Sequence, residues 1–460
     1  MRSGREADAF RDVRATGIRG SGFRSCAKRT LLGLAIGLAL ADSSIVTLAL
    51  PEILGDLDVG ITDVAWVLTS FNLVLAVVAL PAAYAARRRP RQAFFAGTLV
   101  FVAASLACGL APWFELLLAA RCVQAAGAAL VVVSALALLS NGTGAVGTWV
   151  AAGVLGAALG PALGGVLTEL LGWRSIFLAQ VPAALVPLLA ARGVHAAPPR
   201  EPPGLPRPVP NLALFLLSGG LVAAFFLVVL LLVEGWGMSP ATAGIVVMAL
   251  PLAALVSRRL VPATTSPRLR IASGAVLVAG GLTALAVLPR AGWEWTIAPQ
   301  LLVGAGLGLT LGELTERALA GRDYVVHGGW TIASRHAGVV VGLLLLAPVL
   351  TEALERSSEE AIRAGTAVVL DSRVPALDKL RVAQDVLEEV DAAERRGELP
   401  RVERVFEDRP DDEEHRALSS ALQDQLDRAV TDAFSNPFLL AAALALAALL
   451  PVGVIRGATR

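Results

Sequence analysis

The chain consists mostly of long apolar runs between Thr30 and Arg456, and its charged residues are concentrated in the gaps between these runs. A run of about 20 largely apolar residues is long enough to cross a bilayer as a helix. Because a backbone inside lipid must satisfy its own hydrogen bonds, this pattern predicts a bundle of transmembrane helices. The composition agrees, since 55% of the 460 residues are hydrophobic and only 17% are charged, against about 25% in soluble domains.

We predict an all-α polytopic membrane protein with twelve spans, divided into two groups of six by the segment 192–211. This segment contains PPREPPGLPRP, which is too rich in proline for a helix and is expected to be an extended linker. Paired halves are the common plan of secondary transporters, which bind substrate between the halves near the membrane midplane. The predicted spans are Thr30–Leu50, Ala65–Ala86, Ala93–Ala111, Phe114–Leu139, Val146–Leu167, Ser175–Ala191, Leu212–Val233, Ala241–Val256, Ile271–Leu288, Ile297–Leu319, Trp330–Leu350 and Pro437–Val454.

Basic residues gather in alternate gaps, which is typical of gaps that face the cytoplasm. Arg87, Arg88 and Arg89 lie between the second and third spans, and Arg258 and Arg259 lie between the eighth and ninth. The other gaps are mainly acidic and contain tryptophans, as expected at a membrane interface. We therefore expect a multi-pass protein of the cytoplasmic membrane with both termini in the cytoplasm. The predicted regions are a basic tail at 1–29, a six-helix bundle at 30–191, the linker at 192–211, the second bundle at 212–353, an insert at 354–435, and the last span and tail at 436–460.

The segment 354–435, between the last two spans, is a strongly acidic insert that this topology places outside the cytoplasm. It holds 21 of the 38 acidic residues and only 12 of the 39 basic ones. Apolar residues recur at helical spacing, for example Leu377, Leu380, Leu387 and Leu418, which predicts two or three amphipathic helices, the last continuing into the final span. We expect another insert helix or the outer mouth of the bundle to cover the apolar faces. An extracytoplasmic protein or lipid partner is the alternative.

No sequence motif indicates hydrolysis, nucleotide binding or metal binding. There is no P-loop, so ATP hydrolysis by this chain is not expected. Three cysteines without paired spacing argue against a disulfide framework or a zinc site. We expect no enzymatic activity, no cofactor, no metal and no nucleic-acid partner. The histidines are scattered, and we expect each to be solvated or interfacial rather than a ligand: His195, His327, His336 and His415.

Ionisable residues inside the spans are few, and they are informative because a charge in lipid costs several kcal/mol. Asp42 lies in the first span and Arg121 in the fourth. Asp42 is either a proton or cation site or a structural partner of Arg121, and we favour the functional role. Arg121 keeps its proton, so it positions or tunes a carboxylate rather than carrying a proton. Glu313 and Arg317 are four residues apart, which predicts an interfacial ion pair.

The fifth span contains a dense group of glycines around one proline, in the sequence GVLGAALGPALGG. Small residues three and four apart let helices approach closely, and a proline can bend a helix. We expect Gly160, Pro161 and Gly164 to form a close-packed hinge against the other half. Ordinary tight packing is the alternative.

Several runs of this sequence occur together in a fixed order. LADSSIVTLALPEI, WVLTSFNLVLAVVALP, RCVQAAGAAL, GPALGGVL and GWRSIFLAQVP follow one another in the first half, and GWGMSPATAGIVVMALP, GAGLGLTLGELT and GGWTIASRHAGVVVG occur in the second. The set resembles the major facilitator superfamily, specifically its drug/proton antiporter branch, whose members usually have fourteen spans. The resemblance implies the major facilitator fold, with two six-helix bundles.

The resemblance also implies roles for individual residues. In this family the acid of the first span is linked to proton coupling, which assigns that role to Asp42, with Arg121 beside it. The eleventh-span arginine of the branch is matched by Arg335. The antiporter motif of the fifth span implies export rather than uptake and is matched by Gly156, Gly160, Pro161, Gly164 and Gly165. The residues expected at the substrate cavity or its gates are Trp66, Asn72, Gln124 and Arg335.

One loop departs from the family pattern. Between the second and third spans the family has a Gly-x-x-x-Asp-Arg-x-Gly-Arg-Arg pattern, and this chain has PAAYAARRRPRQ, without the acid or the glycine. The family loop forms a charged latch between the halves. Of that latch, the sequence keeps only the basic residues Arg87, Arg88 and Arg89.

The expected function is proton-coupled antiport that exports a lipophilic or amphipathic small molecule across the cytoplasmic membrane. A cavity lined by Ala, Val, Leu and Phe suits an apolar substrate better than a sugar. The expected partners are this substrate, protons and the lipid bilayer. One alternative is an exporter of a lipid or cell-envelope precursor that uses the insert. Another is a non-transporting membrane binding or assembly protein, which the altered loop suggests.

Overall fold

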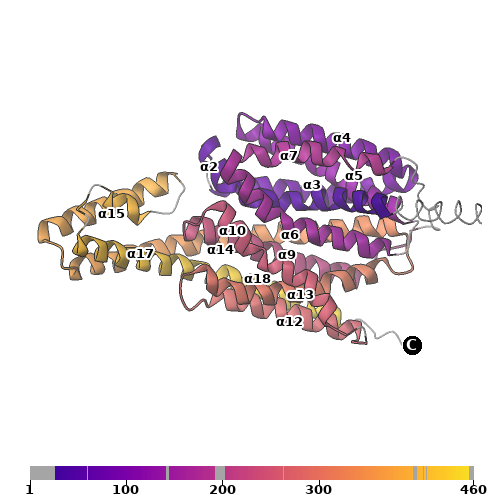
Figure 1. The fold of residues 1–460 in the computed structure, drawn as a ribbon. Helices are drawn as coiled ribbons and strands as arrows, with labels where there is room; N and C mark the ends of the chain where they lie inside the picture. Colours follow the sequence, from indigo (N-terminus) through magenta and orange to yellow (C-terminus); the bar gives the residue numbers. More distant parts are fainter. Residues whose placement is uncertain are drawn as a thin grey trace, which may run out of the picture.

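The computed structural model describes residues 26–59, 61–140, 144–191, 203–262, 264–396, 401–407, 409–410 and 412–454, and no strand occurs within these ranges. The helices form two groups that lie side by side, with a smaller group projecting from one end (Figure 1). After the first helix, Cys26–Thr47, the elements are α2 (Leu50–Leu57), α3 (Ile61–Arg88), α4 (Pro90–Gly109), α5 (Phe114–Leu139), α6 (Ala145–Leu171), α7 (Arg174–Leu185), α8 (Leu188–Ala191), α9 (Pro208–Leu230), the π-helix η1 (Leu231–Gly235), α10 (Pro240–Val247), α11 (Ala249–Leu260), α12 (Pro267–Ala286), α13 (Trp293–Leu319), α14 (Tyr324–Asp371), α15 (Ala376–Arg396), α16 (Val402–Phe406), α17 (Glu413–Ala433), α18 (Ser435–Ala447) and α19 (Leu449–Val454).

The predicted all-α membrane fold is confirmed. In the described residues, eleven helical stretches are long and apolar enough to cross a membrane. The predicted sixth span, Ser175–Ala191, is not among them, because it is divided into α7 and α8 at Val186 and Pro187. Pro187 has no N–H to donate to the preceding turn, which explains the end of α7. α7 still packs against α4 within the first half.

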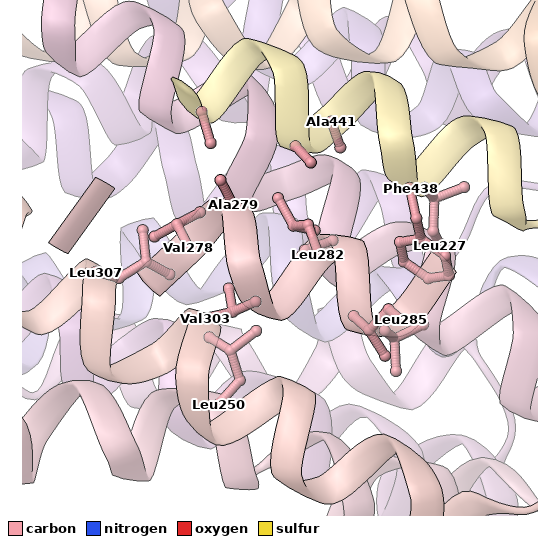
Figure 2. Close-up of a cluster of buried hydrophobic side chains, with 14 of the residues drawn as sticks. Leu227, Leu250, Val278, Ala279, Leu282, Leu285, Val303, Leu307, Phe438 and Ala441 are labelled. Carbon is pink, nitrogen blue, oxygen red and sulfur yellow. The ribbon is translucent and has the colours of Figure 1, made fainter. Parts of the chain in front are cut away.

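Each half has its own apolar core. Figure 2 shows the core of the second half, where Leu282 and Leu285 of α12 lie between neighbouring helices. Val303 of α13 approaches from one side and Phe438 of α18 from the other. In the first half, buried aromatic side chains such as Phe94 perform the same role. Both clusters also include residues of the other half, such as Leu48 in the second-half cluster and Ile332 of α14 in the first-half cluster, so apolar side chains pack where the halves meet.

The helix α14 joins the membrane part to the insert. Its first part, Tyr324–Leu354, is apolar enough to span a membrane, and the helix then continues without a break to Asp371, for 48 residues in total. The predicted boundary at Leu354 therefore falls inside a helix. At the other side of the insert, only Phe434 separates α17 from α18, so the last insert helix runs into the final span as predicted.

The insert has a small core of its own. Val382 of α15 and Leu418 of α17 are buried in this core, so insert helices cover one another as expected. The prediction was wrong for part of α15, because Leu377, Leu380 and Leu387 remain exposed. Helical spacing identified an apolar face that is wider than the face the neighbouring helices cover.

The two ends of the membrane bundle differ. The insert projects from the end at which α2 lies (Figure 1). At the opposite end lie the junction of α3 with α4, which carries Arg87, Arg88 and Arg89, and the start of α14. We call these two ends the insert end and the arginine end.

Candidate functional site: a cavity between the two bundles

A cavity lies between the two halves and is lined by helices from both. It contains about 1290 Å³ of space, counting its open mouth. The first helix, α3 and α6 line it from the first half, and α9, α11, α13 and α14 line it from the second. Most of the lining is aliphatic or aromatic, as in Phe225 and Phe226 of α9. The polar lining residues are Ser43, Ser44, Thr47, Asn72, Ser218, Thr315, Arg335 and His336.

A hydrogen bond joins the two halves at the wall of this cavity. Asn72 of α3 donates through Nδ2 to the carbonyl oxygen of Leu68 at 2.8 Å. Its Oδ1 lies 2.7 Å from His336 Nδ1 on α14. An amide oxygen can only accept, so the imidazole carries its proton on Nδ1 and donates it to Asn72. The expectation that His336 is solvated or interfacial was wrong, since it is buried at the centre of the protein.

Arg335 precedes His336 on α14 and also lines the cavity. Its Nε atom is buried and has no hydrogen-bond partner in the described part of the chain. The sequence-based assignment of Asn72 and Arg335 to the cavity agrees with this placement. The adjacent His336 could have been found from its position beside Arg335 in one apolar span.

Asp42 and Arg121 lie in the interior of the first half, outside the cavity lining. Both side chains are fully buried, and Arg121 Nη1 forms an ion pair with Asp42 Oδ2. The Arg121 guanidinium also lies over the ring of Phe71, 4.3 Å from its centroid. Asp42 Oδ1 and Arg121 Nη2 have no hydrogen-bond partner in the described residues. Asp42 immediately precedes Ser43, which does line the cavity.

Gln124 extends this ion pair into a buried polar network. Its Oε1 accepts from Arg121 Nη1 at 2.6 Å. Its Nε2 donates to Ser105 Oγ at 2.8 Å and to Gln180 Oε1 at 3.1 Å. Gln124 is therefore a partner of Arg121 rather than a cavity residue. The network connects four helices of one bundle, and a change in the charge of Asp42 would be felt by all of them.

The glycines of α6 face two different neighbours. Gly156, Gly160 and Gly164 pack against the first helix of the same half, and an added Cβ atom would overlap Gly37, Ser44 and Ile45 respectively. The expectation that Gly160 and Gly164 pack against the other half was therefore wrong.

Contact with the other half occurs at Gly165 and Pro161. A Cβ atom at Gly165 would overlap the carbonyl oxygen of Pro240 on α10. The carbonyl oxygen of Pro161 faces Gly244 of α10, where an added Cβ would lie 2.6 Å from it. Sequence spacing found the glycine group, but the rotation of α6 decides which glycine faces which helix.

At the arginine end an ion pair links the two halves. Arg87 Nε, at the end of α3, donates to Asp323 Oδ2 at 2.9 Å. Asp323 Oδ1 caps the start of α14 by accepting from Val325 N at 3.0 Å and Val326 N at 3.1 Å. The acid missing from the loop between spans two and three is thus supplied by the other bundle. Asp323 was not identified from the sequence, because its role depends on a contact 236 residues away.

At the insert end the halves meet again, beside a second cavity that we call the vestibule. Its lining includes Glu52, Glu169 and Glu234, together with Arg401 of the insert. Glu169 Oε2 accepts from Ala241 N at 3.0 Å, which ties α6 to the start of α10. Partial burial raises the pKa of Glu52 above its ordinary value. The vestibule also shares Thr47 and Phe226 with the central cavity.

The helix α2 is fastened to α7 at this end. Trp173 Nε1 donates to Asp56 Oδ2 at 2.9 Å, and Arg174 Nη1 forms an ion pair with the same oxygen. Hydrogen bonds from Arg174 and then from Trp173 lower the pKa of Asp56 below its ordinary value.

The remaining predicted residues lie away from the cavity. Trp66 is 46% exposed and is not part of the described cavity lining. The i,i+4 pair of Glu313 and Arg317 is confirmed, with Arg317 Nε 3.2 Å from Glu313 Oε1. His195 lies outside the described residues. His327 and His415 are buried, so the expectation for them was also wrong. The described residues contain no cluster of histidine, cysteine and acidic side chains that could hold a metal ion.

Two bundles of spanning helices around a shared cavity define a multi-pass membrane transporter. The family model described as Major Facilitator Superfamily matches residues 32–347. The chain belongs to the Major Facilitator Superfamily.

Several proteins of known role are similar to part of the chain. It is 37% identical over 179 residues to the Drug efflux pump JefA of Mycobacterium tuberculosis, an alignment that covers 37% of this chain and 35% of the relative. It is 36% identical over 167 residues to the Methylenomycin A resistance protein of Streptomyces coelicolor, with 35% of each covered. For the Cephamycin export protein CmcT of Amycolatopsis lactamdurans the identity is 36% over 175 residues, with 36% of each covered. The chain thus matches little more than a third of the length of these relatives.

Solved structures agree on the fold. The inward-facing, occupied structure of a bacterial homolog to the human lysosomal transporter Spinster has a TM-score of 0.62 and 17% identity, covering 92% of this chain and 96% of that one. The unoccupied form has a TM-score of 0.58 and 16% identity, covering 94% and 98%. At this identity the likeness concerns the fold alone.

Proposed function

We propose that this protein is a proton-coupled antiporter that exports a lipophilic or amphipathic small molecule across the cytoplasmic membrane. In this proposal the insert lies outside the cytoplasm and both termini lie inside. The relatives named as efflux, resistance and export proteins support export of a small molecule. The mostly apolar lining of the central cavity supports a substrate with a large apolar part.

The observation that carries the proposal is the buried ion pair of Asp42 and Arg121 beside the cavity wall. A proton that reaches Asp42 removes the negative charge and leaves Arg121 with Gln124 and the ring of Phe71 as its neighbours. The first helix then loses its strongest tie to α5. Because Ser43 and Ser44 of that helix line the cavity, protonation changes the cavity wall and couples proton entry to substrate release.

Contacts between the halves at both ends support an alternating cycle. The pair of Arg87 and Asp323 closes the arginine end, and the bond from Ala241 to Glu169 closes the insert end. An exporter must break one of these closures at a time. A retained latch at the arginine end favours a transporter over a non-transporting assembly protein, because an assembly protein has no need for paired closures.

Proton flux in reconstituted vesicles tests the proposal. Vesicles that carry the purified protein and an internal pH dye are given candidate lipophilic compounds, and proton movement that depends on compound is recorded. We expect flux with the native protein and none with Asp42→Asn. The double variant Asp42→Asn with Arg121→Gln, which removes both buried charges, separates loss of coupling from loss of folding. Native flux in the folded double variant would exclude Asp42 as the proton site.

The proposed orientation has its own test. In a cysteine-free background, a cysteine at Arg88 should be protected from an impermeant thiol reagent in intact cells, and a cysteine at the exposed Leu377 should react. Reaction at Arg88 from outside would reverse the proposed direction of transport.

A second candidate function is the export of a lipid or cell-envelope precursor that passes through the insert. An apolar pocket of about 770 Å³ lies between α14, α15, α16 and α17. Arg401 lines both this pocket and the vestibule, and the vestibule shares Thr47 and Phe226 with the central cavity. The central cavity, the vestibule and the insert pocket thus share wall residues in succession, which supports a lipid route through the insert.

A bulky side chain in the insert pocket distinguishes lipid export through the insert from export of a small molecule through the central cavity alone. Ala429 lines the pocket, so Ala429→Trp should block transfer of a lipid while leaving export of a lipophilic small molecule through the central cavity intact. Ala367 is exposed on the same part of α14, and Ala367→Trp is the matched control. Lipid that co-purifies with the native protein and is lost only in Ala429→Trp would support the second candidate. Equal lipid content in all three proteins would remove it.

A further inference from the structure

Among the described residues, Arg335 in the wall of the central cavity has no acidic partner. Arg335 forms no ion pair and no hydrogen bond in the described part of the chain, and its Nε is buried. A guanidinium keeps its proton in proteins. The cavity wall therefore holds a permanent positive charge on a partly buried side chain.

Two other arginines of the described spans, one fully buried and one partly buried, have acidic partners. Arg121 pairs with Asp42, and Arg270 lies 3.5 Å from Glu313. A buried charge without a partner is strongly destabilising, because burial removes its hydration and nothing replaces it. Arg335 differs from these arginines in facing a space large enough to admit a partner from outside the protein.

The described lining of the cavity supplies no acid to neutralise Arg335. Its described lining residues include hydroxyl groups, Asn72 and His336, but no aspartate or glutamate. Glu52 and Glu169 line the separate vestibule. Around the guanidinium, the rest of the wall is mostly aliphatic and aromatic, with Phe225 and Phe226 among its larger side chains.

We propose that the transported molecule is an amphipathic anion whose carboxylate, phosphate or sulfonate binds the guanidinium of Arg335. Its apolar body lies against the aliphatic and aromatic wall. A planar guanidinium can donate two parallel hydrogen bonds to such an anion, which gives it orientation as well as charge. A lipophilic cation is disfavoured in the same cavity because Arg335 repels it. This inference rests on the proposed transport function and specifies its substrate class.

The test compares two probes that differ only in charge. Dansyl-labelled undecanoic acid is negatively charged at neutral pH, and its methyl ester is not. Both are titrated by fluorescence onto the purified full-length protein in nanodiscs of phosphatidylcholine. We expect the native protein to bind the acid about tenfold more tightly than the ester, because only the acid can pair with Arg335. Equal affinity for the two probes would overturn the inference.

Variants at the arginine sharpen this comparison. Arg335→Met should lose the preference for the acid while keeping affinity for the ester, and Arg335→Lys should retain part of the preference. Arg290 is exposed and is not part of the described cavity lining, so Arg290→Met is a control that removes one positive charge outside the cavity and should change neither affinity. Since Arg335→Met removes a partly buried charge that has no acidic partner among the described residues, its Tm should equal or exceed that of the native protein. Undiminished preference for the acid in a folded Arg335→Met would contradict the proposed site.

Competition distinguishes the two sources of such an anion. Displacement of the acid probe by dodecyl phosphate indicates a free single-chain amphiphile. Displacement by phosphatidylglycerol incorporated in the nanodisc indicates a lipid headgroup. Failure of both competitors would contradict an anion site.

The binding test is independent of proton coupling. Arg335-dependent binding of the acid without compound-dependent proton flux would retain the anion site and remove the antiport mechanism. Proton flux driven by lipophilic cations, without preferential binding of the acid, would retain the antiport mechanism and remove the anion site.

Discussion

His336 Nδ1 donates a hydrogen bond to Asn72 Oδ1 across 2.7 Å, and this bond joins α14 of the second bundle to α3 of the first at the wall of the central cavity. The two residues are 264 positions apart in the sequence. The contact requires this relative position of the two bundles, so its presence reports how the bundles are placed.

Replacing Asn72 with leucine should loosen this closure. A buried neutral hydrogen bond contributes about 1 kcal/mol, which corresponds to about a fivefold change in the ratio of two conformations. We therefore expect a shift of this size toward open conformations, measured by spin-label distances between α3 and α14. His336→Leu should give a similar shift, and the double variant should add little to either. Additive shifts would show that the two side chains do not act through each other.

Asp42 and Arg121 are expected to stabilise the first bundle only when both charges of their ion pair are present. Asp42→Asn leaves Arg121 buried without a negative partner, which should lower the free energy of unfolding by about 3 kcal/mol. Arg121→Gln combined with Asp42→Asn removes both charges and should recover most of this loss. Chemical denaturation of the purified variants measures both effects. No recovery in the double variant would mean that Arg121 contributes through the ring of Phe71 rather than through its charge.

Removing the charge of Asp323 should open the arginine end. Asp323→Asn keeps a side-chain oxygen that can cap α14, but it loses the charge that holds Arg87. Arg87 is partly exposed, so we expect the ion pair to stabilise the closed arginine end by about 1 kcal/mol. The readout is increased thiol reactivity of a cysteine placed at Thr315, which lines the cavity. Arg87→Gln, which removes the other charge of the pair and leaves the cap of α14 in place, should increase the reactivity by a similar amount.

Two neighbouring glycines of α6 should respond differently to the same substitution. Gly164→Ala places a methyl group against the backbone of the first helix at Ile45, so it should lower thermal stability. Gly165→Ala meets Pro240 of the other half, so it should impair transport at normal membrane levels. Gly147 has open space at this position, and Gly147→Ala is the control. Wild-type transport by a well-expressed Gly165→Ala would show that the halves do not meet at this glycine during the cycle.

Acidification should release α2 from α7. The lowered pKa of Asp56 keeps its carboxylate charged at pH values where an isolated aspartate is already protonated. Its stabilising effect is therefore fully present above the ordinary pKa of 3.8 and is lost as the pH falls through the lower folded-state value. Fluorescence of Trp173, in a variant without the other tryptophans, should report this loss because its indole donates to Asp56. Asp56→Asn should abolish the transition.

The sequence alone determined the class of fold and much of its organisation. Runs of apolar residues long enough to span a bilayer predicted nearly every helix, because lipid permits few other structures. The pair of Asp42 and Arg121 was one of two readings of the sequence, and the structure contains it. Glu313 and Arg317 were predictable because four residues bring side chains onto one helix face.

The tertiary structure alone decided the contacts between the bundles. Nothing in the local sequence places His336 against Asn72 or Asp323 against Arg87, since each pair joins helices from different halves. The rotation of α6 turned Gly164 toward its own bundle and Gly165 toward the other. Periodicity specifies which residues share a face of a helix, but the direction of that face depends on how all the helices pack. For the same reason, only the folded protein reveals that Arg335 faces a cavity without an acidic partner.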